Sequence, residues 1–165
     1  LFGLAPGAHG STRTGRPFTG DASGAFLYPL LYEAGLSSRP ESHPGDDLRL
    51  YGVYLTAAVR CAPPGNRPTR EELRACSRWT AVELGLLEEA RVYLALGRVA
   101  LEALLEHFGL RKSTYPFFHG AHYPLPGGRH LLASYHVSRQ NTQTGRLSRE
   151  MFLEVLLKAK ALAGL

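Results

Sequence analysis

The sequence has few cysteines, no long hydrophobic run and almost no lysine. No apolar stretch reaches the roughly 18 residues that a membrane-spanning helix needs, which excludes that class of protein. The two cysteines cannot by themselves complete a zinc or an iron–sulfur site. The first residues show neither an initiator methionine nor the pattern of a secretory signal peptide, and we expect the chain to lack an N-terminal segment upstream of Leu1.

The positive charge is carried almost wholly by arginine. There are 16 arginines against 3 lysines, and the formal net charge is +5 at pH 7. Arginine binds phosphate through a planar fork of N–H donors, so this excess favours a nucleic-acid partner. A thermophilic composition explains the same bias, because asparagine, glutamine and methionine are scarce as well. The charge alone leaves both interpretations open.

Strand and helix patterns alternate along the chain. Apolar, β-prone segments predict strands that end at Phe2 and that span 48–61, 91–97 and 129–138. Amphipathic segments predict helices at 24–35, 69–90, 98–109 and 148–164. This alternation predicts a single α/β domain over residues 1–165, a three-layer αβα sandwich around a central, mostly parallel four-stranded sheet.

Three loops follow the predicted strands and carry unusual residues, at 5–24, 56–68 and 136–147. Ligands of parallel sheets bind at the carboxyl ends of the strands, so we expect these loops to meet there. The first belongs to "GLAPGAHGSTRTGRPFTGDASG", which holds six glycines and no G-x-G, and a dinucleotide fingerprint is therefore excluded. Gly15 and Gly20 have the spacing of a phosphate-binding loop, but Asp21 stands where that loop has a lysine.

Asp21 therefore suits a different chemistry. A carboxylate beside a glycine loop can stabilise a developing positive charge or orient an attacking water. Aspartate is also a favoured N-cap, and a predicted helix follows at once. At the other loop, His136 ends an apolar strand and is either structural or a neutral hydrogen-bond donor to an anion. Both pairs of alternatives stay open.

The middle loop contains both cysteines, Cys61 and Cys76, in "CAPPGNRPTREELRAC". Taken alone they are two inert thiols or one disulfide. A zinc site on His119, His122 and His136 would lack a fourth ligand.

Together, the glycine loop, "VRCAPPGNRPT…C" and "HVSRQNTQTGRL" (136–147) resemble the family 5 iron–sulfur uracil-DNA glycosylases. The resemblance runs from Gly3 to Leu147 with the three motifs in order. It implies a DNA repair enzyme that flips a deaminated base out of duplex DNA and hydrolyses its N-glycosidic bond to leave an abasic site. It also implies a 4Fe–4S cluster on Cys61, Cys76 and two further cysteines expected in the missing N-terminal segment.

The resemblance assigns roles residue by residue. Asp21, His136 and Asn66 are the implied catalytic residues, and Phe18, Ala5 and Gly7 surround the base. The implied DNA contacts are Ser11, Thr12, Arg13, Arg16, Arg139, Gln140, Asn141, Thr142 and Arg146. In the best-known family of the wider group an aspartate handles the water where this chain has Ala5, so Asp21 or Asn66 must take that task.

Two further departures widen the expected range of substrates. Gly7 replaces a tyrosine that blocks the methyl group of thymine in that best-known family, and Ala57 and Ala58 stand where related enzymes place a base-reading asparagine. We expect excision of uracil and hypoxanthine, with xanthine, ethenocytosine and mismatched thymine as further candidates. The expected setting is double-stranded DNA in the prokaryotic cytoplasm, near the nucleoid, with a monomeric enzyme and no membrane. The alternatives are a non-catalytic nucleic-acid-binding module and a hydrolase of free nucleosides.

Overall fold

The computed structural model describes residues 1–165 and contains one five-stranded sheet in the order β2-β1-β3-β5-β4. Its strands are β1 (Phe2–Gly3), β2 (Thr56–Ala57), β3 (Val92–Leu96), β4 (His122–Leu125) and β5 (Arg129–Ser134). The strands pair in parallel except β4, which runs antiparallel to β5. The mostly parallel sheet is confirmed, but the prediction of four strands is wrong.

The extra strand is the edge strand β4. It forms a hairpin with β5 through the turn at Gly127 and Gly128. The sequence pattern missed it because the strand has four residues and includes Pro124, which lacks the N–H that a central strand needs. At the edge of a sheet a proline is tolerated, since one side of the strand has no partner.

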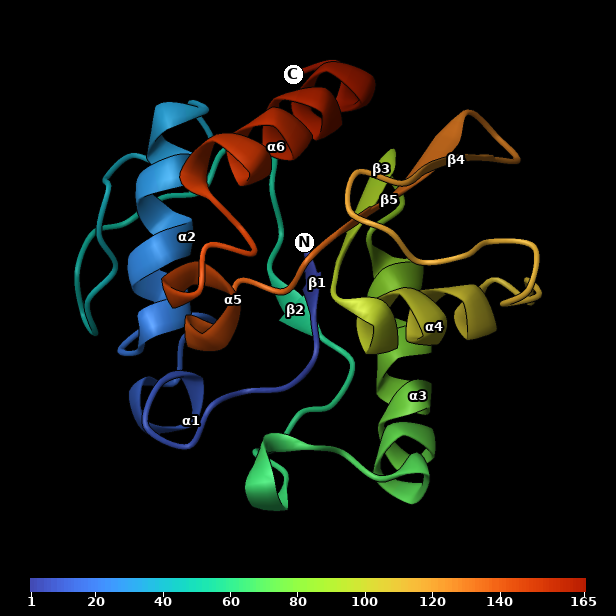
Figure 1. Cartoon of the computed structure of the whole chain (residues 1–165), viewed down its shortest axis with the longest axis horizontal. Helices are drawn as coiled ribbons and strands as arrows, with labels where there is room; N and C mark the ends of the chain where they lie inside the picture. The colour runs from blue at the N-terminus through green and yellow to red at the C-terminus, as the bar shows by residue number, and fades with distance from the viewer.

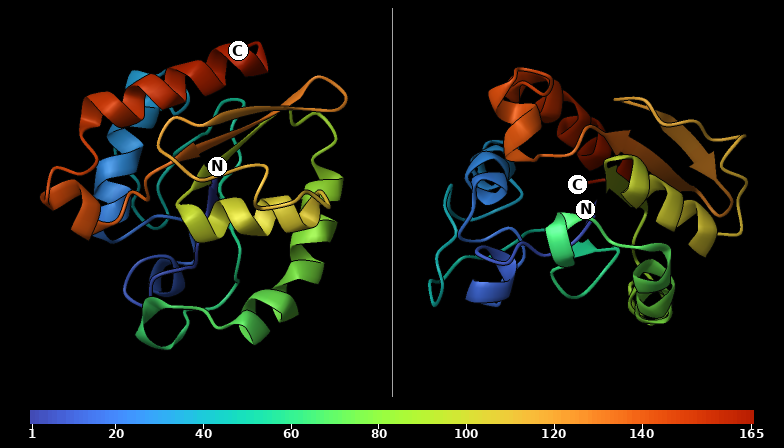
Figure 2. Two further views of the ribbon diagram at one scale, coloured as in Figure 1. Left: turned by 45° about the vertical axis from the view of Figure 1, so that its right-hand side comes forward. Right: turned by 60° about the horizontal axis from the view of Figure 1, so that its bottom comes forward.

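Helices cover both faces of the sheet, as Figure 1 and Figure 2 show. They are α1 (Ser11–Thr14), α2 (Ala22–Glu33), the 3-10 turn η1 (Pro64–Asn66), α3 (Arg70–Leu86), α4 (Arg98–His107), α5 (Arg139–Gln143) and α6 (Arg149–Ala163). Side chains alternate along β3, so Leu94 and Leu96 pack with α2 and α6, while Tyr93 and Ala95 pack with α3 and α4. The three-layer arrangement is therefore confirmed.

Local signals placed the helices well and one strand poorly. Helix α3 begins after a capping box in which Thr69 and Glu72 bond reciprocally, as their spacing predicts. The predicted strand 48–61 shrinks to two residues, because β2 lies at the sheet edge and its only neighbour in the sheet, β1, is just as short. Leu55, Ala58 and Val59 around it are nevertheless buried, which explains the apolar pattern. No helix has the length and apolar character needed to cross a bilayer.

The carboxyl ends of β1, β2, β3 and β5 face one edge of the sheet, which we call the carboxyl edge. Helix α1, the turn η1, the start of α4 and helix α5 gather along this edge in Figure 1. The three loops with unusual residues all leave the sheet here. The opposite side, where β3 and β5 begin, is called the amino edge.

Candidate active site at the carboxyl edge

Asp21 is held at the start of α2 by two different contacts. Its Oδ1 accepts a hydrogen bond of 3.1 Å from the Gly24 N–H, which makes it the N-cap. Its Oδ2 lies against the glycine loop, where a Cβ on Gly10 would overlap the carboxylate and one on Gly7 would come within 3.0 Å of it. The capping role is thus present, and the glycines let the main chain enclose the second oxygen. The carboxylate is fixed in place for any further task.

Phe18 has a strained backbone on the same loop. Its φ is 52°, in the left-handed region that costs a bulky residue on the order of 1–3 kcal/mol. The Ser11 hydroxyl accepts a 3.0 Å hydrogen bond from the Phe18 N–H, and the Phe18 carbonyl fits only because Gly24 has no Cβ. The edge of the ring lies beside Gly3, at the end of β1. Strain of this kind accumulates at ligand sites, which favours a binding role for Phe18.

His136 lies just beyond β5 and is half-buried. Burial lowers the pKa of its imidazole, and the negative charge of Asp21 partly opposes that shift. The Asn141 amide donates a 2.9 Å hydrogen bond to the His136 carbonyl, and a Cβ on Gly97 would lie 3.4 Å from the His136 Cβ. The imidazole is therefore neutral at pH 7, positioned by its neighbours, and within electrostatic reach of Asp21.

The fold brings together two of the three predicted catalytic residues. Asp21 and His136 come from the first and the third loop and lie within electrostatic range of each other without a direct hydrogen bond, and helix α2 contacts α5. The middle loop begins beside the first, because the Ala58 N–H bonds to the Gly3 carbonyl at 3.0 Å. Asn66, however, is exposed on η1 with a φ of 58°, and its N–H bonds to the Pro63 carbonyl within that turn. No described contact joins it to Asp21 or His136.

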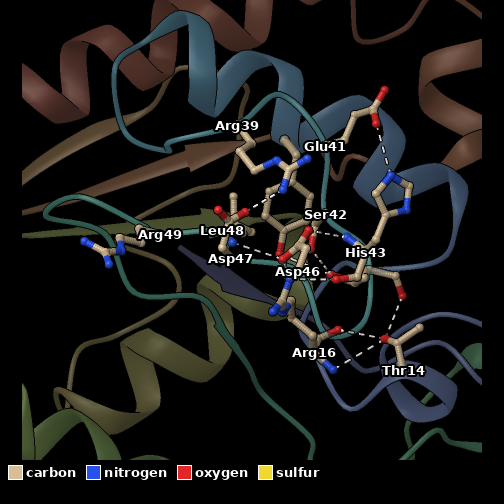
Figure 3. Close-up of polar contacts among 12 residues, drawn as sticks. Thr14, Arg16, Arg39, Glu41, Ser42, His43, Asp46, Asp47, Leu48 and Arg49 are labelled. Atoms are coloured by element: carbon tan, nitrogen blue, oxygen red, sulfur yellow. Dashed lines mark hydrogen bonds and ion pairs between the residues drawn. The ribbon is translucent and has the colours of Figure 1, made fainter.

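Some predicted phosphate contacts already have partners inside the protein. Arg16 forms an ion pair of 2.5 Å with Asp46 and also donates to the Ser42 hydroxyl, as Figure 3 shows. Together with the backbone N–H groups of His43 and Leu48, this guanidinium holds the pKa of Asp46 well below its usual range. Asn141 and Ser11 hold His136 and Phe18 as described above. DNA binding by these three stays a prediction, and it would compete with internal contacts.

The other predicted DNA contacts lie on the surface of the same edge. Arg13 uses its Nε to hold the His9 carbonyl at 2.8 Å, and Arg146 stacks on the ring of Tyr135 with 4.7 Å to its centroid. Thr12, Arg13, Arg139, Gln140 and Arg146 are exposed and Thr142 is half-buried, while Ala5 and Gly7 lie half-buried in the first loop. Their roles stay predictions.

Sequence reasoning missed the polar network beneath the middle loop. Glu83 on α3 binds Arg60 through two hydrogen bonds of 2.8 and 3.1 Å, and it also accepts from the hydroxyls of Thr56 and Tyr54. Burial alone would raise the pKa of Glu83, but the bonds from Arg60 and Thr56 outweigh it and lower that pKa. These residues are too far apart in sequence for any local pattern to pair them.

The two cysteines are free thiols on two different segments of the chain. Cys61 is exposed in the middle loop, Cys76 is half-buried on α3, and neither forms a disulfide. The Arg60–Glu83 pair ties the residue before Cys61 to the same helix. No group of three or more histidine, cysteine or acidic side chains comes together, so a zinc site on His119, His122 and His136 does not form.

Comparisons with known proteins show the family to which the chain belongs. The family model described as the uracil DNA glycosylase superfamily matches residues 1–160. The chain is 87% identical over its whole length to a type-5 uracil-DNA glycosylase of Thermus thermophilus, of which it covers 75%. This chain belongs to the type-5 branch of the uracil-DNA glycosylase superfamily.

More distant members of the superfamily are similar over nearly all of the chain. A type-5 uracil-DNA glycosylase of Pyrobaculum aerophilum is 48% identical over 99% of this chain and 71% of its own length. A type-4 uracil-DNA glycosylase of Thermotoga maritima is 31% identical over 98% of this chain and 75% of its own. The resemblance on which the residue roles depend is therefore confirmed at the level of the family.

Proposed function

We propose that this chain is a monofunctional DNA glycosylase that hydrolyses the N-glycosidic bond of uracil in double-stranded DNA and leaves an abasic site. The type-5 relatives support the reaction class. The observation that carries the chemistry is the Asp21 carboxylate, which Gly24 and the glycine loop hold within electrostatic range of the half-buried His136 imidazole at the carboxyl edge. The target base must first leave the stack, which costs roughly a few kcal/mol and least at a mismatched pair.

Phe18 then receives the flipped base in this proposal. Stacking of a base on an aromatic ring is worth on the order of 1–3 kcal/mol. The Ser11 hydroxyl and the close fit against Gly24 fix the backbone of Phe18 before the base arrives. A ring that is already fixed loses little entropy on binding, so most of the stacking energy holds the base.

Asp21 and His136 divide the charges of the transition state. As the bond breaks, positive charge develops on the sugar and negative charge on the base. The Asp21 carboxylate stabilises the sugar and orients the water, whose hydroxyl joins the sugar carbon while a proton goes to the departing base. The neutral imidazole of His136 and backbone N–H groups near Ala5 donate to the base oxygen. Preorganised donors of this kind are each worth about 3 kcal/mol.

Within this proposal Asp21, rather than Asn66, handles the water. Asp21 is fixed beside the loop that carries Phe18, while Asn66 is exposed on η1.

We extend the proposal to other deaminated bases, hypoxanthine first. Strand β2 ends at Ala57, and Ala58 is buried, so no amide side chain at either position can pair with one base and reject others. Gly7 adds no side chain on the other side of the proposed pocket. Excision measured on duplexes that carry uracil, hypoxanthine, xanthine, ethenocytosine or mismatched thymine ranks the substrates, and strict selectivity for uracil would contradict this extension.

We also propose that Cys61 and Cys76 supply two thiolates of an iron–sulfur cluster whose role is to hold the loop 62–75 in place. The support is the pair of unbridged thiols on two segments that the Arg60–Glu83 pair joins. Iron and sulfide content of the full-length protein, measured for the native protein and for Cys61→Ser, tests the idea. Equal iron content in both would contradict it.

The test of the main proposal is strand cleavage of a uracil-containing duplex by alkali after incubation with the protein. We expect cleavage with the native chain and a loss of about 100- to 1,000-fold in rate for Asp21→Asn, the size typical of one lost transition-state contact. Asparagine caps helices as well as aspartate does, so the variant should fold. The control is Asp47→Asn, which changes an exposed carboxylate paired with Arg39. DNA binding without cleavage would instead support the non-catalytic module.

A further inference from the structure

Two arginines and two aromatic rings form one cluster beside the proposed active site. Arg146 lies over the ring of Tyr135 at 4.7 Å, and Arg98 lies over the ring of Phe117 at 5.3 Å. The two rings are themselves in contact, with centroids 6.2 Å apart. We call these four side chains the arginine–aromatic cluster. It was not foreseen from the sequence, because its members come from four separate segments.

The fold places this cluster at the carboxyl edge. Arg98 is the first residue of α4, directly after β3, and Tyr135 directly follows β5. Because β3 and β5 are parallel neighbours, their carboxyl ends lie side by side, which can be followed in Figure 2. Tyr135 directly precedes His136 in the chain, so the cluster continues the proposed site toward the β4 side of the sheet.

His119 gives the cluster a rigid base. Its Nδ1 accepts a 3.2 Å hydrogen bond from the Tyr135 N–H, and its ring stacks on that of Tyr135 with centroids 5.0 Å apart. Burial lowers the pKa of His119, which keeps its ring nitrogen able to accept. The segment "FFHGAHYPL" (117–125) contains both His119 and Phe117. Here it supplies Phe117 and the histidine that holds Tyr135.

Neither arginine of the cluster has an acidic partner. Both side chains are exposed, and neither takes part in any of the ion pairs of the chain. Stacking on a ring restrains a guanidinium while its N–H edges stay open for a planar, two-point contact with an anion. Two guanidinium groups without an acidic partner, beside the proposed DNA site, suit phosphate better than any neutral ligand.

We propose that the arginine–aromatic cluster binds backbone phosphates of the duplex that flanks the damaged base, and that Tyr135 and Phe117 act by holding the two guanidinium groups ready. The proposal rests on the proposed function only in taking DNA as the ligand. It extends the implied DNA contacts of the loop 136–147, to which Arg146 already belongs, onto Arg98 at the start of α4 and gives the two rings a positioning role. Arg98, Phe117 and Tyr135 have no role in the chemistry.

The chain offers a matched control at the amino edge. Arg129 lies over the ring of Phe108 at 5.8 Å, is the first residue of β5 and has no acidic partner. It therefore has the same kind of stacking and the same charge as Arg98 and Arg146, but on the opposite side of the sheet.

The experiment measures binding to an undamaged duplex over a range of salt concentrations. Each lost phosphate contact reduces the slope of log affinity against log salt by about 0.9. We expect Arg98→Ala and Arg146→Ala each to reduce the slope by about that amount, the double variant by about twice as much, and Arg129→Ala not at all. Tyr135→Phe should keep native binding, while Tyr135→Leu should weaken it.

Two outcomes would overturn the proposal. One is an unchanged slope in the double variant, and the other is an equal effect of Arg129→Ala, which would show a general effect of charge. Because the duplex is undamaged, the result does not depend on catalysis. If the native chain excises uracil but the double variant keeps the native slope, only this proposal is wrong. If the double variant reduces the slope but the native chain excises no uracil, only the proposed function is wrong.

Discussion

The two edges of the sheet differ in what they contain. At the carboxyl edge lie the only non-glycine residues with a positive φ, Phe18 and Asn66, together with the half-buried imidazole of His136 and the fixed carboxylate of Asp21. At the amino edge, a groove of about 650 Å³ is lined mainly by apolar side chains such as Leu84, Leu86 and Val92, and Phe18, Asp21 and His136 take no part in it.

The residues of the carboxyl edge lower the stability of the fold, whereas the apolar residues away from that edge supply it. The left-handed backbone of Phe18 and the partial burial of the His136 imidazole each oppose folding. They persist because the leucine-rich layers on both faces of β3 and β5 stabilise the fold enough to hold the loops at the carboxyl edge in these unfavourable conformations. The groove at the amino edge therefore does not mark the proposed active site. Backbone strain and shifted pKa values locate that site better.

The largest effect that sharpens this comparison is expected at Gly10. A methyl group there would overlap the Asp21 carboxylate, so Gly10→Ala should displace Asp21 and lower uracil excision by about 100-fold or more. The control is Gly85→Ala near the amino edge, where an added Cβ meets open space within α3 and should stabilise the protein by about 0.5–1 kcal/mol. Excision rates and urea unfolding measure both. Native activity in Gly10→Ala would remove the argument for Asp21.

A smaller loss is expected for Phe18→Ala. Removal of one stacking ring should cost about 1–3 kcal/mol of binding to the flipped base, or roughly 10- to 100-fold in kcat/KM. Tyr32→Ala is the control, because that ring is 51% exposed on α2 and outside the site. Single-turnover excision on a uracil duplex gives the comparison. An equal loss in both variants would mean that Phe18 has only a structural role.

The pH dependence of stability should reveal the half-buried imidazole of His136. Burial places its pKa in the folded protein below the ordinary value of 6.5, so folding favours the neutral form. Its contribution is complete above pH 6.5 and is lost as the pH falls through the lowered pKa. Asp21→Asn removes the charge that raises this pKa, and the pKa of His136 should fall further. Histidine ring signals in NMR titrations measure it, and an unchanged pKa would separate the two residues.

The smallest effect concerns the network beneath the middle loop. Glu83→Gln leaves the half-buried guanidinium of Arg60 without its charged partner and should lower the free energy of unfolding by about 1–2 kcal/mol. Since the pKa of Glu83 is lowered, this difference is present above the ordinary value of 4.5 and disappears at more acid pH. Glu33→Gln, which breaks the exposed pair with Arg149, should change stability by less than about 1 kcal/mol. Equal effects in urea unfolding would contradict the role given to Glu83.

Features that depend on neighbouring residues were predicted well. Thr69 and Glu72 form the capping box that begins α3, and Asp21 caps α2. Ser148 caps α6, where its hydroxyl accepts a 3.1 Å hydrogen bond from the Met151 N–H. Apolar spacing located β3, β5 and the long helices to within a few residues. The short segments α1, α5 and β4 were missed, because four or five residues carry too little periodicity to be recognised.

The amino-acid sequence by itself determined the alternation of strands and helices, the caps, and the glycine-rich loop that leaves room for a carboxylate, since each is a local property of the chain. Only the tertiary structure decided that Asp21 lies within electrostatic range of His136, that Arg16 pairs with Asp46, and that Arg98 and Arg146 belong to one cluster. Those contacts depend on the order in which the strands pair, which places the ends of distant segments side by side. No spacing along the sequence records that order.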